Sequence, residues 1–292
     1  MTGISRLSSA PPASDRRDNA LLEIHAGGSK PPLICVHGES GHLRLFCNLA
    51  SHLDPAQPVY GLRGVVDSGP PRVPYPTFEE MAGRYVLEVS ERDHRGPYVI
   101  LGECNGALLA YELAQQLVAR GEDVALLALV DSFGPGEPRI GVSDWAYRRV
   151  NALRMLAFHL SALMHIDSGD RRAYVAARVR RIRARLSTRL SGHRGPVPED
   201  VLRQRAYREA SGAYRPAPYP GRVVLLHGAR LPWGARTGSD LGWGRLVADL
   251  EVTALPAYLG TCMLEPVVGR LAAALERALA GVAARAGRDS GH

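Results

Sequence analysis

Short apolar runs alternate with amphipathic stretches through much of this 292-residue chain. Apolar runs that end in turn residues have the length of buried strands, whereas apolar positions three and four residues apart indicate helices. Strands are expected at 31–38, 58–62, 97–102, 123–132, 221–228 and 250–258, and helices at 77–89, 105–121 and 265–282. This alternation predicts an α/β fold in which a mostly parallel sheet carries helices on both faces.

The alternation stops between residues 136 and 219, where helical spacing and many arginines replace it. We expect an all-helical insertion at 136–219, within one domain that residues 21–135 and 220–283 form together. Residues 1–20 and 284–292 have compositions typical of disordered tails.

The composition excludes several classes of protein. The chain is 46% hydrophobic and 22% charged, which is ordinary for a globular protein. It has neither an apolar run long enough to span a membrane nor an N-terminal secretory signal, so we expect a cytoplasmic protein with free thiols. The cysteines lack metal-type spacing, and Cys35, inside an apolar run, is expected in the core.

The net charge of +7 is unevenly distributed along the chain. Between Trp145 and Arg194 there are twelve arginines and two acids, Asp167 and Asp170. Such a segment is either a solvated helix face or a docking surface for an acidic partner. No recognition motif or interleaved aromatic residues accompany the charge, so nucleic acid is not expected as a partner.

One short motif indicates covalent chemistry. The sequence GECNG follows the expected strand at 97–102 and fits the frame G-x-nucleophile-x-G, with Cys104 in the nucleophile place. The glycines let the chain turn sharply and let strand and helix approach closely. Cys104 would then project beside the positive end of the helix that follows Asn105, which is expected to lower the pKa of its thiol. The alternative is a core cysteine in an ordinary strand–helix turn.

From about Pro31 to Gly281 the chain resembles the α/β-hydrolase thioesterases of nonribosomal peptide and polyketide synthesis. The resemblance rests on ICVHGESGHLRLFCNLASHL, QPVYGL, FEEMAGRY, GPYVILGECNG, LLAYELAQQLVARGEDVALLALVDS and YRPAPYPGRVVLL. It implies an α/β-hydrolase sheet with a helical lid over an acyl channel. It also implies a reaction that takes acyl chains from the phosphopantetheine arm of a carrier protein, by hydrolysis or cyclisation, without a metal or cofactor of the enzyme's own.

The resemblance also assigns site residues. Cys104 takes the place of the family's serine, and Asp131, 27 positions later at the end of a strand, takes the place of its acid. The loop after His37 takes the oxyanion-hole place, where the backbone N–H groups of Glu39 and Asn105 would face the developing oxyanion.

The third catalytic position departs from the family. The family's histidine lies in a PGDHxTMLREP-like stretch, and the matching stretch here is PAYLGTCMLEP at 256–266, with both prolines in register. Leu259 then occupies the histidine place, and a shifted alignment gap puts Gly260 there instead. Neither residue supplies a base.

Four other residues are candidates for the missing base. His42 lies in the oxyanion-loop segment, and His227 ends the expected strand 221–228 at the correct edge of the sheet. Glu39 and Glu103 flank the site and could accept protons. Each has a plainer alternative as an ordinary loop or strand-end residue, and spacing does not decide between the two interpretations.

A cysteine depends on a base less than a serine does, because a thiol with a pKa of about 8.5 is a few per cent ionised at pH 7. Loading Cys104 from a carrier thiol exchanges one thioester for another, whereas hydrolysis requires activated water. The sequence therefore favours cyclisation or transfer, and in its Cys–Asp pair it resembles the off-loading cyclases of this fold, Dieckmann-type enzymes included, although it lacks their histidine.

Two alternatives remain open. One is a hydrolytic, editing thioesterase with a relocated base, and the other is a non-catalytic relative that binds a carrier protein or an acyl chain. The off-loading cyclase and the editing thioesterase both need a reactive Cys104, whereas the non-catalytic relative does not. In each case the expected partner is an acyl or peptidyl carrier protein, with the Arg-rich lid as a docking surface and no role for a membrane.

Overall fold

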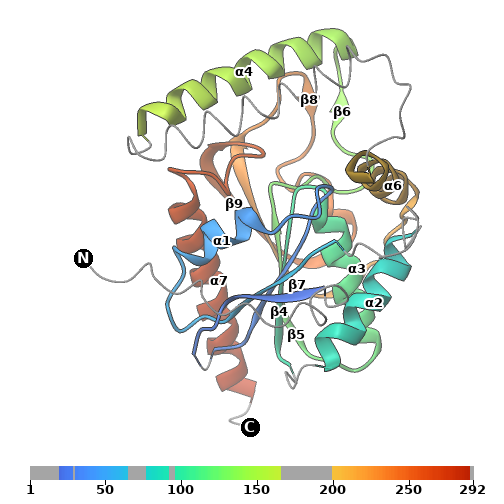
Figure 1. Cartoon of the computed structure of the whole chain (residues 1–292), viewed down its shortest axis with the longest axis vertical. Coiled ribbons are helices and arrows are strands. Elements are labelled where there is room, and N and C mark those ends of the chain that lie inside the picture. The colour runs from blue at the N-terminus through green and yellow to red at the C-terminus, as the bar shows by residue number, and fades with distance from the viewer. Residues whose placement is uncertain (1–19, 29, 65–76, 92–95, 166–198, 290–292) are drawn as a thin grey trace.

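A seven-stranded sheet forms the centre of the computed structural model, which describes residues 20–28, 30–64, 77–91, 96–165 and 199–289 (Figure 1). The strand order is β1-β3-β2-β4-β5-β7-β9. β1 runs antiparallel to β3, and all other neighbours in this sheet are parallel. The parallel strands therefore bring their carboxyl ends to one edge, where a site can be assembled.

The strands match the expected positions closely. They are β1 (Leu21–His25), β2 (Leu33–Val36), β3 (Val59–Leu62), β4 (Tyr98–Glu103), β5 (Val124–Val130), β7 (Tyr219–Arg230) and β9 (Val247–Tyr258). The sequence pattern did not predict β1, because its side chains are mostly half-buried or exposed and it forms an edge of the sheet.

Helices cover both faces of the sheet, as predicted. Their bounds are α1 (Arg44–Ala50), α2 (Phe78–Glu91), α3 (Gly106–Ala119), α4 (Asp144–His165), α6 (Glu199–Ala213) and α7 (Val268–Asp289), with a short 3₁₀ helix at Trp243–Arg245. Thr77 caps the start of α2, since the Glu80 N–H donates to Thr77 Oγ1 at 3.1 Å. Of these helices, α2 and α3 pack on one face, while α1 and α7 pack on the other.

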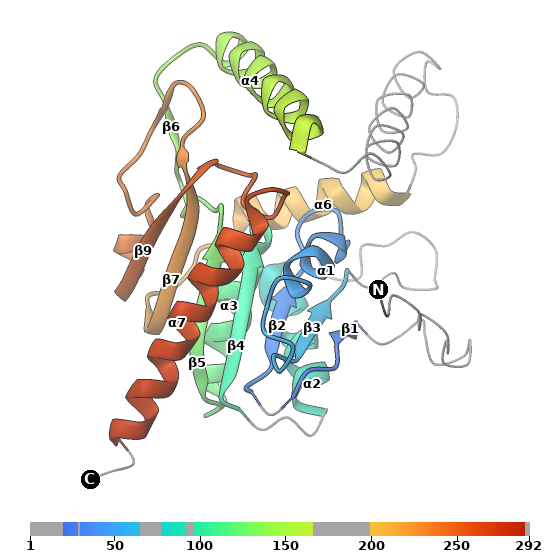
Figure 2. The same ribbon diagram turned by 90° about the vertical axis from the view of Figure 1, so that its left-hand side faces the viewer.

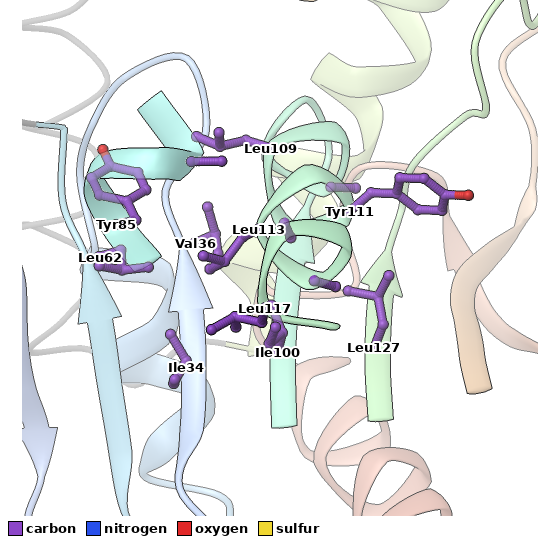
Figure 3. Packing of buried hydrophobic residues seen from close by; sticks show 14 of the residues in the cluster. Ile34, Val36, Leu62, Tyr85, Ile100, Leu109, Tyr111, Leu113, Leu117 and Leu127 are labelled. Atoms are coloured by element: carbon purple, nitrogen blue, oxygen red, sulfur yellow. The ribbon is translucent and has the colours of Figure 1, made fainter. Parts of the chain in front are cut away.

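Successive side chains of each strand enter the two cores alternately. Ile34 and Val36 pack with α2 and α3, whereas Leu33 and Cys35 pack with α1 and α7. Figure 3 shows the first core, where α3 presents Leu109, Leu113 and Leu117 to Val36 and Ile100. Full burial of each such side chain contributes about 1.5–3 kcal/mol, so strands that are apolar on both faces are stable only between two helical layers. The expected burial of Cys35 is confirmed.

The insertion contains α4 and α6, which lie beyond the carboxyl ends of the strands (Figure 2). Its expected all-helical character is wrong at one point, because β6 (Arg139–Ile140) pairs antiparallel with β8 (Ala235–Arg236). A two-residue strand is too short to leave a periodic signal in the sequence. Nine of the twelve arginines noted above belong to 166–198, outside the described residues.

The ends of the chain differ slightly from expectation. Ala20, the last residue of the expected N-terminal tail, is buried and its N–H donates to Glu88 Oε2, while residues 1–19 lie outside the described residues. At the other end α7 continues to Asp289, past the expected boundary at 284, because its last turns consist largely of the strong helix formers Ala and Arg. No helix within the described ranges has both the length and the apolarity to cross a bilayer.

Candidate active site

Cys104 stands at a sharp turn between β4 and α3, with a positive φ of 53°. The two glycines of the motif are sterically required. A Cβ on Gly102 would lie 2.6 Å from Ala107 Cα, and one on Gly106 would lie 2.7 Å from His37 O. The close approach of strand, helix and oxyanion loop therefore forces the strained backbone at Cys104, as the motif predicts.

Asp131 occupies the matching position on the next strand. β4 and β5 pair Glu103 with Val130, so Cys104 and Asp131 are the first residues beyond the two paired strands. Asp131 also has a positive φ, 49°, and in the described ranges Leu241 is the only other non-glycine residue with this conformation. Strained residues of this kind persist where the surrounding structure fixes them, and they concentrate at functional sites.

The carboxylate of Asp131 is buried and accepts three hydrogen bonds. Gly228 N–H donates to Oδ1 at 2.8 Å, Cys262 N–H donates to Oδ2 at 2.8 Å, and the Cys262 thiol donates to Oδ1 at 3.2 Å. Burial raises the pKa of Asp131, although these donors oppose the shift. Asp131 thus connects β5 to the end of β7 and to the loop after β9.

The two residues predicted at the family's histidine place, Leu259 and Gly260, lie directly after β9. Leu259 follows β9, its N–H donates to Arg230 O at 3.0 Å, and its side chain packs partly buried against the core formed by α2 and α3. Gly260, the alternative occupant, forms the adjoining turn with a φ of 85°. Neither position provides an imidazole next to Asp131.

The structure also places His37, His42 and His227. His37 is buried, its Nε2 is 2.6 Å from Tyr85 Oη, and burial lowers its pKa to about 4, so the ring is neutral. His42 is exposed. His227 is buried, with Nδ1 3.1 Å from Gly228 O. Across the described segments, none of these three imidazoles forms a hydrogen bond with Cys104.

The two expected oxyanion-hole residues lie side by side. A turn closed by Gly41 N–H and Gly38 O at 2.9 Å holds Glu39 next to the start of α3. The Asn105 side chain donates to Glu39 Oε2 at 3.4 Å, and the Asn105 backbone N–H hydrogen-bonds the Cys104 sulfur. The arrangement provides one N–H at the nucleophile and a neighbouring loop that can provide a second.

Two residues of α6 that the sequence did not single out close over this loop. The hydroxyl of Tyr207 donates to Asn105 O at 3.1 Å and to His37 O at 3.4 Å, and Arg208 Nε lies 2.9 Å from Glu39 Oε1. Tyr207 is buried. A tyrosine and an arginine on an amphipathic helix carry no motif, so the sequence held no signal for this contact between α6 and the active-site turn.

The electrostatics of the nucleophile differ from the expectation. Burial of the sulfur, and then the Glu103 carboxylate, raise the pKa of Cys104 to about 12, while the Asn105 N–H opposes this. Although Cys104 is exposed to water, its raised pKa means that the thiol is mostly protonated at neutral pH. The expected lowering by the helix N-terminus is therefore wrong, because desolvation and neighbouring carboxylates outweigh the helix end.

A segment in the first half of the chain matches a known protein family. Residues 31–164 match the Thioesterase domain family. Similar curated proteins include malpinin synthetase of Mortierella alpina, 39% identical over 129 residues, and the probable non-canonical nonribosomal peptide synthetase CymA of Salinispora arenicola strain CNS-205, 35% identical over 131 residues. These matches cover 44% and 45% of this chain but only 2% of either synthetase.

Solved structures extend the likeness to most of the chain. A four-domain nonribosomal peptide synthetase bound to AMP and glycine superposes with a TM-score of 0.65 at 21% identity, over 89% of this chain and 20% of that one. The NocB thioesterase domain, in covalent complex with a fluorophosphonate nocardicin G analogue, gives 0.60 at 24% identity, over 89% and 99%. The chain thus has the α/β-hydrolase fold of these thioesterase domains, and its residues 31–164 match the Thioesterase domain family. The expected resemblance to thioesterases of nonribosomal peptide synthesis is confirmed.

Proposed function

We propose that this protein off-loads acyl or peptidyl chains from the phosphopantetheine arm of a carrier protein through a covalent intermediate on Cys104. Release then occurs by cyclisation or by transfer rather than by hydrolysis. The observation that carries the proposal is the position of Cys104, on a strained turn beside the Asn105 N–H, where thioesterases of this fold place their serine.

Acyl loading exchanges one thioester for another. Cys104 Sγ attacks the thioester carbonyl, the bond to the pantetheine sulfur breaks, and the proton of the Cys104 thiol ends on the departing pantetheine thiol. The tetrahedral intermediate carries its negative oxygen toward the backbone N–H groups proposed for the oxyanion hole, those of Glu39 and Asn105. Reactant and product are both thioesters, so the step needs little net driving force.

The second step distinguishes the outcomes. Water is a poor nucleophile until a base removes its proton, and among the described residues none of His37, His42 and His227 is hydrogen-bonded to Cys104. The apolar Leu259 stands where the family's base would activate that water. A carbon or nitrogen nucleophile within the bound chain is held next to the carbonyl and gains the advantage of proximity. These features support ring closure over hydrolysis.

Asp131 has a structural role in this proposal. In a serine-type triad the buried acid orients a histidine. Here the carboxylate accepts hydrogen bonds from Gly228 and Cys262 and so fixes the loop after β9 beside the nucleophile. The site of the nucleophile is thereby held in place, although no proton passes through Asp131.

The test is intact-protein mass spectrometry after mixing the protein with an acyl-loaded carrier protein or an acyl-pantetheine. The wild type is expected to gain the mass of the acyl group, and Cys104→Ala to gain none. Cys47→Ala is the matched control, because Cys47 is an exposed free thiol on α1 outside the site. A wild type that never gains mass from several acyl thioesters would favour a non-catalytic carrier- or acyl-binding protein.

Product analysis separates the remaining alternatives. With a substrate that contains an internal amine or an acidic carbon, we expect the cyclic product to exceed the free acid. A predominance of free acid would instead indicate a hydrolytic, editing thioesterase with a base brought in from elsewhere, and His42 and His227 remain the histidine candidates for that role. The His42→Ala and His227→Ala variants then identify it.

A further inference from the structure

We propose that Glu103 is the acid–base residue of this site, which takes the proton from Cys104 during acyl loading and gives it to the leaving pantetheine thiol. This inference rests on the proposed function, since it concerns the loading step of that reaction. It assigns to a carboxylate the part that an imidazole plays in a histidine-containing site.

Glu103 is placed for this role by the strand that carries the nucleophile. It is the last residue of β4 and directly precedes Cys104. Its backbone is paired with Val130, the residue before Asp131, and its side chain is half-buried. Neighbouring Cα atoms are about 3.8 Å apart, and the glutamate side chain is long enough to bring its carboxylate toward the sulfur of the next residue.

Glu103 is also the one carboxylate of the three around the nucleophile that is not already engaged. Glu39 pairs with Arg208 and accepts from the Asn105 side chain. Asp131 accepts three hydrogen bonds. Within the described ranges, no hydrogen bond or ion pair involves the Glu103 carboxylate. A half-buried carboxylate without a partner is costly, and binding a proton relieves that cost.

The surrounding charges set the affinity of Glu103 for a proton. Burial, and then the charge of Asp131, raise the pKa of Glu103 to about 7. The Glu103 carboxylate acts in turn on the thiols of Cys104 and Cys262 and on the Tyr207 hydroxyl of α6. Glu39, from the oxyanion loop, acts on the same Cys104 thiol. A base that titrates near neutral pH is suited to general catalysis at that pH.

Cys104 needs a base because its thiol is protonated at neutral pH. Because the pKa of Cys104 is raised, little free thiolate exists at neutral pH. The proton must therefore move as the sulfur–carbon bond forms, from Sγ to a Glu103 oxygen. When the tetrahedral intermediate collapses, the bond to the pantetheine sulfur breaks and the proton passes from Glu103 to that sulfur. Glu103 ends the step ionised, as it began.

The Glu103→Gln variant distinguishes a base from a neighbouring negative charge, because the two roles predict opposite changes in the rate of acyl loading. A mere neighbouring charge suppresses thiolate formation, so its removal would speed both acyl loading and alkylation by iodoacetamide. If Glu103 is the base, Glu103→Gln slows loading by roughly 10²-fold or more, the size typical of general acid–base catalysis. Alkylation, which needs only the thiolate, is then unchanged or faster.

The experiment measures loading from an acyl-pantetheine, followed by intact mass at several pH values, on the wild type, Glu103→Gln and Glu103→Asp. The wild-type rate should rise with an apparent pKa near 7. Glu103→Gln should lose that rise, and Glu103→Asp should retain it at a lower rate. Glu91→Gln is the control, since Glu91 is exposed at the end of α2, away from the site.

The outcomes separate this inference from the proposed function. If the wild type loads and Glu103→Gln loads as fast or faster, the role of Glu103 is wrong while Cys104 remains the nucleophile. If the wild type does not load at all, the proposed function fails first. Should Glu103→Gln fail to fold, Glu103→Asp decides. A wild-type loading rate that does not rise near neutral pH, or a Glu103→Asp rate equal to that of the wild type at every pH, would overturn the assignment.

Discussion

The Cys262 thiol donates a hydrogen bond to Oδ1 of Asp131 at 3.2 Å, and its backbone N–H donates to Oδ2 at 2.8 Å. One residue thus occupies both oxygens of the acid that, in a serine-type triad, would orient a histidine. With Gly228 N–H also on Oδ1, this carboxylate is committed to the loops around it. These hydrogen bonds give Asp131 a structural role beside the nucleophile.

Asp131→Asn should therefore damage the fold more than the chemistry. The amide can accept only through one oxygen, so at least one buried donor loses its partner, which costs about 1–3 kcal/mol of unfolding free energy. Chemical denaturation measures this loss. Asp123→Asn, at an exposed position, should have almost no effect.

The same variant tests the role of Asp131 in loading. At a temperature where Asp131→Asn is folded, its rate of acyl loading should fall by less than about tenfold, because the described partners of the carboxylate are Gly228 and Cys262 and none of them is an imidazole. In a serine-type triad the corresponding change costs about 10⁴-fold. A loss of that size here would show that Asp131 does orient a base in the working enzyme.

Glu103 should make stability depend on pH in a defined direction. Its pKa is about 7 in the folded protein against 4.5 as the ordinary value. Between these values the folded state holds a proton that the unfolded state has released, so the free energy of unfolding falls as pH rises. One pKa unit corresponds to about 1.4 kcal/mol, and partial access of water limits the total to about 2–3 kcal/mol.

Urea denaturation of the wild type and Glu103→Gln at pH values from about 4.5 to 8 measures this effect. The glutamine variant should be the more stable protein at pH 8, and the difference between the two should shrink toward low pH. A difference that is constant with pH would mean that Glu103 titrates normally.

The sequence predicted the scaffold better than the electrostatics of the site. The GECNG motif fixed the strand–turn–helix around Cys104, because its glycines are required by contacts of less than 3 Å. The PAYLGTCMLEP stretch predicts Leu259 at the position of the family's histidine, and that assignment stays a prediction, while the structure places Leu259 directly after β9. In contrast, the effect of the helix N-terminus on Cys104 was predicted with the wrong sign, because the balance depends on burial and on carboxylates.

The sequence also failed to predict two contacts between residues that are far apart along the chain. Tyr207 lies 102 residues from Asn105 along the chain, and Cys262 lies 131 residues from Asp131. Tyr207 belongs to no motif, and Cys262, although it lies in the PAYLGTCMLEP stretch, has no chemical role there that would single it out. The identity of such contacts depends on how the insertion and the loop after β9 pack, which periodicity does not encode.

Tyr207 should hold α6 closed over the active-site turn. Tyr207→Phe removes a buried hydroxyl that donates to Asn105 O and His37 O, and the expected cost is about 1–2 kcal/mol. Arg208→Gln removes a partly exposed ion pair with Glu39 and should cost less than about 1 kcal/mol. Hydrogen exchange in α6 should rise in the first variant more than in the second. Equal exchange in both would show that the hydroxyl does not anchor the helix.

The arginine-rich segment of the insertion should govern carrier affinity. Twelve arginines between Trp145 and Arg194 would attract an acidic carrier surface, and this attraction weakens as the Debye length falls from roughly 30 Å at 0.01 M salt to roughly 10 Å at 0.1 M. Replacement of Arg180, Arg181 and Arg183 by glutamine should weaken binding several-fold and reduce its salt dependence. Arg277→Gln on the exposed side of α7 is the control. An affinity indifferent to salt would contradict this docking surface.

Restoring an imidazole tests whether its loss directs the reaction. Leu259→His places a histidine at the family position, but the structure indicates that Asp131 is already engaged by Cys262. The single variant should therefore raise hydrolysis only modestly. Leu259→His combined with Cys262→Ala frees one lone pair on Asp131 Oδ1, so the new ring can be oriented by the acid.

The double variant should convert more acyl-enzyme to free acid, by about one to two orders of magnitude relative to cyclic product, since a positioned base contributes roughly 10²–10⁴-fold. Product ratios measured by chromatography and mass spectrometry, with Cys262→Ala alone as the control, provide the comparison. If hydrolysis is already fast in the wild type and His42→Ala abolishes it, the base has moved to the oxyanion loop. In that case neither Leu259 variant should change the product ratio, and the apolar residue at 259 would not be what protects the acyl-enzyme from water.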